Sequence, residues 1–310
     1  MARWAGTTGR RRGDQVSGTQ VLPLRPMTVG ELLDAAASLL RAHWKPLLAG
    51  SFALAAVEQV LMTWLRMSTE ESLFSGNGLF LVEEPSVLWL WMIAGLTTEI
   101  VIITLLGVPA SRAAAATILN RPAPGFAELY TRGVPWGSVL IVAGILAPIA
   151  AIGAAMCGLP WFVAYGFAGL IVPVLIIDGA PLGTAIGRGL SLAARAGGRA
   201  FGVRLLGYCS WMLVRLAITC GAWTAADQIS SYSSIFEGRV LLVLGFAYLA
   251  INTMAYAMLA CLDAVTLIET RIRTEGLDIV LSRAAARGDT PNLAPPRMLV
   301  YPPQHGGPPR

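Results

Sequence analysis

Charged side chains are scarce in this chain of 310 residues, because Asp, Glu, Lys and Arg together make up only 13% of it. Soluble domains carry roughly twice that share. Hydrophobic residues make up 55% of the sequence, and its mean hydropathy is +0.63. Apolar runs that reach the ~18–20 residues needed to cross a hydrocarbon core recur along the chain. The composition therefore argues against an ordinary soluble domain and predicts an integral membrane protein.

Residues that carry metal or acid–base chemistry are also few. The two histidines, His43 and His305, have no partner cluster, and the four cysteines form no C-x-x-C pair. The sequence contains no G-x-S-x-G, H-E-x-x-H or phosphate-loop motif. We therefore expect no metal, no cofactor and no enzymatic activity.

Six apolar runs have the length of a transmembrane helix. The third and fourth runs are separated only by Cys157 and Gly158, which predicts a helical hairpin. The predicted fold class is therefore all-α integral membrane, with six transmembrane helices. The predicted spans are Leu47–Leu65, Val87–Val108, Trp136–Met156, Leu159–Ile177, Phe201–Trp223 and Val240–Leu262.

Amphipathic stretches precede the odd-numbered spans, at Thr28–Pro46, Pro124–Trp136 and Pro181–Phe201. Thr28 and Glu31 have the spacing of a capping box, which begins a helix. We expect these stretches to be amphipathic helices in the cytoplasmic membrane interface.

The segment after the sixth span, Asp263–Arg287, is charged and has a helical period. Glu269 and Arg273, and likewise Arg271 and Glu275, are spaced to pair on a helix surface. This pattern predicts one more cytoplasmic helix.

Basic residues lie almost entirely on one side of the predicted spans. Of the 23 Lys and Arg, only Arg66 and Arg239 fall on the other side, and Arg215 falls within a span. The positive-inside rule then makes both termini cytoplasmic. The net charge of +5 is accounted for by these loops, so we expect no nucleic-acid partner.

The two ends of the chain differ in composition from its middle. Residues 1–25 are polar and arginine-rich and residues 289–310 are proline-rich, so both are predicted to be disordered. Residues 26–288 then form the membrane domain. The sequence leaves membrane-protein partners and the oligomeric state open. The residues that we expect to contact anionic lipid headgroups are Arg41, Lys45, Arg188, Arg195 and Arg199.

Three ionisable residues, Glu58, Glu99 and Arg215, fall well inside predicted spans. A charge at the bilayer centre costs at least ~2.5–3.5 kcal/mol, so each of these residues is expected to have a structural or functional role. One interpretation is a proton or substrate relay, and the other is a structural ion pair that fixes helix packing. Arg215 can pair with only one of the two carboxyl groups. The other carboxyl would be buried without a partner, and such a group is expected to hold a proton.

Other polar or helix-breaking residues lie in or beside the spans. Pro148 and Pro173 each release a backbone carbonyl, which is typical of a tolerated kink or of a transporter binding site. Asp178 and Asp263 lie at cytoplasmic ends of spans, where we expect them to be solvated. A lipid-modifying enzyme that uses these aspartates would need a nucleophile that the sequence does not offer.

Residues 185–192, AIGRGLSL, resemble the A-L-x-R-S-x-x-L signature of the glycerophosphoryl diester phosphodiesterase membrane-domain family, with Gly189 in place of serine. Segments Arg25–Asp34 and Arg271–Asp278 resemble the two ends of uncharacterised actinobacterial multi-pass proteins of that kind. The resemblance implies a plasma-membrane protein without the family's separate catalytic barrel.

The sequence thus predicts a non-enzymatic scaffold or accessory subunit of a membrane assembly. The alternative is a small transporter or permease-like protein that uses Glu58, Glu99 and Arg215 around a polar cavity.

Overall fold

The computed structural model describes residues 22–69, 85–195, 198–230, 235–287 and 293. Their regular structure is entirely helical, and six helices are long and apolar enough to cross a membrane. The predicted all-α membrane fold class is therefore confirmed. The helices are α1 (Val29–Ala42), α2 (Trp44–Ser68), α3 (Pro85–Ile118), α4 (Phe126–Tyr130), α5 (Trp136–Ala155), α6 (Leu159–Ala168), α7 (Ile171–Ile177), α8 (Leu182–Arg195), α9 (Arg199–Ser230), α10 (Ile235–Glu275) and α11 (Leu277–Arg287).

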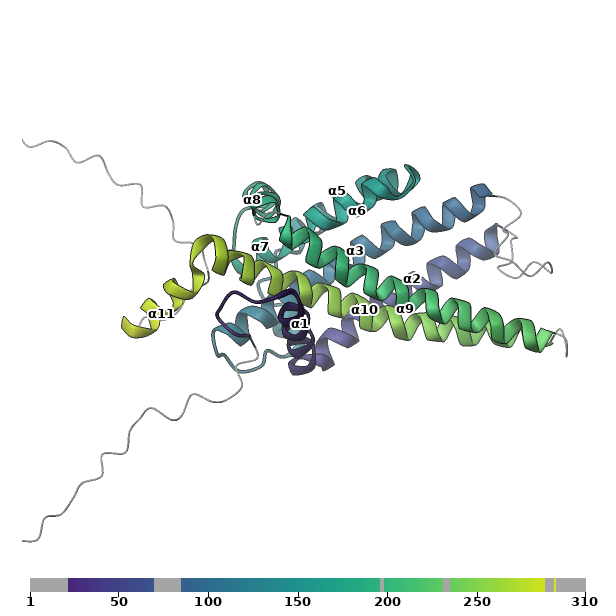
Figure 1. Cartoon of the computed structure of the whole chain (residues 1–310), viewed down its shortest axis with the longest axis horizontal. Helices are drawn as coiled ribbons and strands as arrows, with labels where there is room; N and C mark the ends of the chain where they lie inside the picture. The colour runs from purple at the N-terminus through teal and green to yellow at the C-terminus, as the bar shows by residue number, and fades with distance from the viewer. Residues whose placement is uncertain (1–21, 70–84, 196–197, 231–234, 288–292, 294–310) are drawn as a thin grey trace, which may run out of the picture.

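The last membrane helix, α10, is the centre of the bundle (Figure 1). In its most apolar window 78% of the residues are buried, against 28% for α2 and 22% for α9. It packs on α1, α2, α3, α7, α8, α9 and α11. Polar residues on α10 therefore face other helices instead of lipid.

Helices α1, α8 and α11 gather at one end of the bundle, which we call the α1 end (Figure 1). The capping box at Thr28 is confirmed, because the backbone N–H of Thr28 donates to Glu31 Oε2 over 2.7 Å and Thr28 Oγ1 accepts from the N–H of Glu31. The hydrogen bond from the Thr28 backbone, and after it the one from Arg25, lower the pKa of Glu31 to about 2. Leu32 and Leu39 are fully buried, so α1 packs into the core along one face.

The predicted fourth span is divided into two helices. Helix α6 ends at Ala168 and α7 begins at Ile171. Pro173 has no N–H to donate to the carbonyl of Gly169, four residues earlier, so the helical hydrogen-bond ladder is interrupted there. The kink expected at Pro173 is therefore a break between two short helices.

The segment predicted as a separate helix after the sixth span is divided differently from expectation. Helix α10 continues without interruption to Glu275, so the first half of that segment is the buried end of the membrane helix. Gly276 then adopts a left-handed φ of 63°, which ends α10 and allows α11 to begin. Both predicted pairs form, Arg273 with Glu269 and Arg271 with Glu275.

Most of the two predicted disordered ends, residues 1–21, 288–292 and 294–310, lies outside the described residues. Three leucines within those predicted ends, Leu22, Leu24 and Leu293, are described. Leu22 and Leu293 are only 4% and 3% exposed and belong to the hydrophobic core. The chain is therefore packed against the bundle at both of these positions.

Candidate functional site

Buried polar residues recur along α10 at three depths. Asn252 and Tyr256 form the first level, Asp263 the second, and Glu269 and Arg271 the third. At 1.5 Å per residue, Asn252 and Asp263 are roughly 16 Å apart along the helix axis. Each level contains at least one arginine, so three arginine–carboxylate clusters are stacked through the bundle.

The first level, the mid-bundle network, joins four helices and brings together the three intramembrane charges predicted from the sequence. On one side of it, Arg215 of α9 pairs with Glu99 of α3, with 2.7 Å between Nη1 and Oε1. The hydroxyl of Tyr208 donates to the other oxygen of Glu99 over 2.8 Å. Arg215 Nε also donates to Asn252 Oδ1 on α10 over 2.9 Å.

Glu58 of α2 closes the other side of the mid-bundle network. The Tyr256 hydroxyl and Asn252 Nδ2 both lie against Glu58 Oε2, at 2.6 and 3.2 Å. The hydroxyl of Thr98 lies 3.0 Å from Glu58 Oε1. Glu58 and Glu99 are 5% and 4% exposed, so both carboxyls are held inside the protein and not in lipid.

Four members of the mid-bundle network were not predicted from the sequence, namely Thr98, Tyr208, Asn252 and Tyr256. Asn252 and Tyr256 are four residues apart on one helix, and Tyr208 and Arg215 are seven apart on another. Both spacings place polar groups on a single helix face, which is a signal that the sequence did carry. Thr98 had no such signal, because a lone threonine in an apolar helix is usually satisfied by its own backbone.

The second level is a bidentate ion pair between Arg204 of α9 and Asp263 of α10. The two Arg204 donors, Nε and Nη2, lie 2.5 and 2.9 Å from the two carboxylate oxygens. The Tyr165 ring lies 4.0 Å from the guanidinium carbon. Arg204 and Asp263 are 2% and 3% exposed, so the expectation that Asp263 is solvated is wrong. Packing of α9 on α10 encloses both groups.

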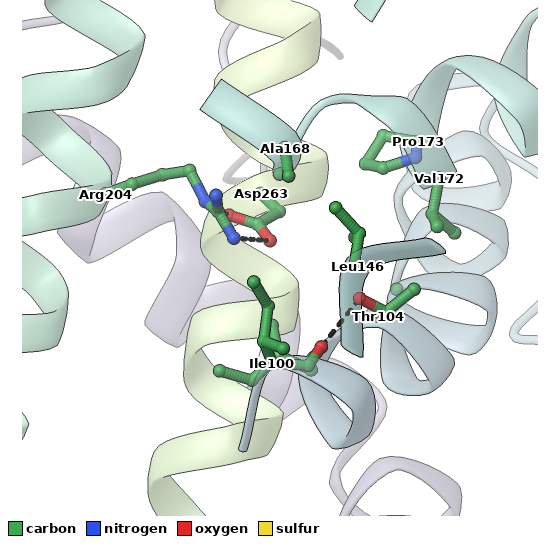
Figure 2. Close-up of a pocket in the computed structure, with 11 residues that line it drawn as sticks. Ile100, Thr104, Leu146, Ala168, Val172, Pro173, Arg204 and Asp263 are labelled. Carbon is green, nitrogen blue, oxygen red and sulfur yellow. Dashed lines mark hydrogen bonds and ion pairs between the residues drawn. The ribbon is translucent and has the colours of Figure 1, made fainter. Parts of the chain in front are cut away.

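A small cavity lies beside this pair, at the break between α6 and α7. Figure 2 shows Arg204 and Asp263 on one side of it and Val172 and Pro173 on the other. Its volume is about 10 Å³, close to the least that holds one water molecule. Gly169 is required at this point, because a Cβ there would lie 2.0 Å from the guanidinium carbon of Arg204. Arg204 Nη1 has no hydrogen-bond partner among the described residues.

The third level, the α1-end network, begins with Asp178 at the end of α7. Its carboxylate accepts from Arg271 Nη1 over 2.6 Å and from Arg188 Nε over 2.8 Å. Glu275 also binds both of these arginines, at 3.0 and 2.6 Å. Asp178 has no exposed side-chain surface, so the expectation that it is solvated is wrong. Two arginines and two carboxylates thus tie α7, α8 and α10 together.

The rest of the α1-end network lies one turn away on α10. Glu269, which is 1% exposed, pairs with Arg273 on its own helix and with Arg199 of α9. Both arginines also donate to the backbone carbonyl of Met27, over 2.8 and 2.6 Å. The chain just before α1 is therefore anchored to α9 and α10 by charged groups.

The residues predicted to contact lipid headgroups fall into two groups. The guanidinium groups of Arg188 and Arg199 pair with the buried carboxylates of Asp178 and Glu269. The sequence did not predict these pairs. Arg41 and Lys45 are exposed, with Arg41 donating to Ser38 and Lys45 lying 5.7 Å from the Trp44 ring. Arg195, at the end of α8, is exposed as well.

Gly189, the departure from the family signature, has a structural reason in this chain. A Cβ at Gly189 would lie 2.9 Å from Cα of Ile171, so the backbones of α8 and α7 approach too closely for serine. This contact holds α8 against α7 and helps Arg188 reach Asp178.

The three levels can hold charges apart from lipid and from one another, and can accept or release protons, but they lack the ligand set of a metal centre. Within the described ranges, no three His, Cys, Asp or Glu side chains gather in a way that could hold a metal ion. Comparison with family models, curated proteins and solved structures gives no match for this chain.

Proposed function

We propose that this chain is a non-enzymatic scaffold or accessory subunit of a plasma-membrane assembly, with both termini cytoplasmic. The observation that carries the proposal is the stack of three buried arginine–carboxylate levels, which link α10 to α2, α3, α7, α8 and α9. Separating such pairs in an apolar medium exposes unpaired charge at high cost. A bundle locked at three depths is suited to presenting fixed surfaces to partners.

The orientation and the lipid contact are part of the same proposal. The positive-inside bias places the α1 end at the cytoplasmic face. There Arg41, Lys45 and Arg195 remain exposed, so they are free to bind anionic headgroups. The resemblance of residues 185–192 to the phosphodiesterase membrane-domain family supports the same location.

A second candidate, a small transporter, is favoured by one observation. The break between α6 and α7 lies against the buried Arg204–Asp263 pair, and interrupted helices beside buried charges line substrate sites in transporters. The two candidates differ in one property: a transporter must open a water-filled path to these charges, whereas a scaffold keeps them dry.

Thiol labelling of native cysteines separates the two candidates. Cys261 is fully buried at the depth of Asp263, although it faces another side of α10, so its labelling reports whether water enters the bundle at that depth. Cys157 is exposed in the turn between α5 and α6. In variants that keep only one of these cysteines, we expect a membrane-impermeant maleimide to label Cys157 in intact cells. Cys261 is expected to react only after denaturation, because no water reaches it in a closed bundle.

A cysteine placed at exposed Arg121, on the α1 side of α3, serves as the orientation control and should react only in permeabilised cells. Labelling of Cys261 in the native protein would favour the transporter. Labelling of the Arg121 position in intact cells would overturn the proposed orientation.

The scaffold proposal also predicts a stable complex in the membrane. Extraction in native polymer nanodiscs, followed by mass measurement and protein identification, should give a particle that contains this chain of 32.8 kDa with at least one other protein in fixed ratio. A particle with this chain as its sole protein would contradict an accessory-subunit role.

A further inference from the structure

The orientation of the Asn252 amide is fixed by Arg215. A guanidinium group only donates hydrogen bonds, so the Asn252 oxygen must face Arg215 Nε, 2.9 Å away. The amide nitrogen of Asn252 therefore faces Glu58 Oε2, at 3.2 Å, and donates to it. The Tyr256 hydroxyl donates to the same oxygen over 2.6 Å. Oε2 thus accepts two hydrogen bonds from α10 and is the unprotonated oxygen of the Glu58 carboxyl.

The other oxygen of Glu58 has a different partner. Glu58 Oε1 lies 3.0 Å from Thr98 Oγ1, which also lies 3.0 Å from the carbonyl of Ala94 and 2.9 Å from that of Gly95. A hydroxyl has one hydrogen, so Thr98 can donate to only one of these three acceptors, and helical threonines commonly donate to a carbonyl of the preceding turn. Two acceptor oxygens would then face each other across 3.0 Å. A proton on Oε1 turns this contact into a hydrogen bond from Glu58 to Thr98.

The charges around Glu58 agree with a neutral acid. The positive charge of Arg215 is taken by Glu99, to which Tyr208 also donates. Among the described side chains, no basic nitrogen lies within 4.0 Å of the Glu58 carboxyl. A carboxylate without a counter-charge in an apolar interior is strongly disfavoured.

We propose that Glu58 is a proton-binding site within the membrane, with the proton on Oε1 donating to Thr98, while Glu99 is the carboxylate that balances Arg215. The groups that face Glu58 are Thr98 and Glu99 from α3, Arg215 from α9, and Asn252 and Tyr256 from α10. The bound proton makes the whole network neutral. Release of the proton would place a second negative charge beside Glu99 and remove the hydrogen bond that Glu58 of α2 donates to Thr98 of α3.

Infrared difference spectroscopy of Glu58→Gln tests the site directly. Glutamine reproduces the hydrogen bonds of a neutral Glu58, because its oxygen accepts from Tyr256 and Asn252 and its nitrogen donates to Thr98. At neutral pH, the spectrum of the native protein minus that of the variant is expected to contain the carbonyl band of a carboxylic acid. Carboxylate bands in this difference would overturn the proposal.

The matched control is Glu99→Gln, whose difference spectrum is expected to show carboxylate bands. Melting temperatures check that the folded proteins are compared: Glu58→Gln should melt with the native protein, and Glu99→Gln on the order of 10 °C lower, because it leaves Arg215 buried without a counter-charge. An acid band that is present in the Glu99→Gln difference and absent from the Glu58→Gln difference would place the proton on the wrong carboxyl and overturn the assignment.

A second variant keeps the test independent of any change at Glu58 itself. Thr98→Val preserves the shape of the side chain and removes the acceptor for the proton on Oε1. The acid carbonyl band is expected to move to higher frequency, since that proton loses its hydrogen bond. An unchanged band would show that Thr98 does not accept from Glu58.

Discussion

Replacement of Arg204 by methionine is expected to lower the free energy of unfolding by about 3–5 kcal/mol. The variant leaves the Asp263 carboxylate, which is 3% exposed, without either of its two hydrogen-bond donors. It also removes the guanidinium group that lies on the Tyr165 ring. Thermal unfolding of the purified protein in detergent, followed by tryptophan fluorescence, measures the loss.

The double variant Arg204→Met, Asp263→Leu tests whether the two residues serve stability only by neutralising each other's charge. Well-packed hydrophobic residues often replace a buried ion pair with no loss of stability, so most of the lost stability should return. Arg132→Met is the matched control, because its side chain is 77% exposed and its change should stay within about 0.5 kcal/mol. A double variant as unstable as the single one would mean that the pair contributes more to the free energy of unfolding than the neutralisation of its two charges.

The membrane helices could be predicted from the sequence because the free energy of inserting apolar side chains depends on local composition. The run that became α5, for example, was predicted to end at Met156 and ends at Ala155. At the break between α6 and α7, Arg204 approaches Gly169 from a distant helix. Sequence periodicity cannot specify such a neighbour.

The burial of the charged residues could be predicted from the sequence for some of them and not for others. Glu58, Glu99 and Arg215 were recognised because any charge in an apolar run is conspicuous. Asp178 and Asp263 were expected in water because each follows an apolar run. Their burial is a result of tertiary packing, in which arginines from α8, α9 and the end of α10 approach them. Partners far apart in the sequence cannot be found from helical spacing alone.

Arg271→Met should have an effect as large as that of Arg204→Met, although Arg271 lies about two turns beyond Asp263 on α10. Arg271 is 1% exposed and donates to Asp178, to Glu275 and to the backbone carbonyl of Leu293. Without it, Asp178 retains only Arg188, which is 24% exposed, and the carbonyl of Leu293 loses its donor. We expect a loss of about 3–5 kcal/mol in the free energy of unfolding.

Hydrogen exchange shows where the stability is lost. In Arg271→Met, amides of α7 and of the last turns of α10 are expected to exchange faster, because Asp178 and Glu275 no longer share a second arginine. Amides near Asn252 should be unaffected, since the mid-bundle network is roughly 28 Å away along α10. Arg283→Met, on the exposed side of α11, is the control and should leave both regions unchanged. Faster exchange along all of α10 would show instead that the three levels unfold as one unit, which would make the α1-end network the anchor of the whole bundle.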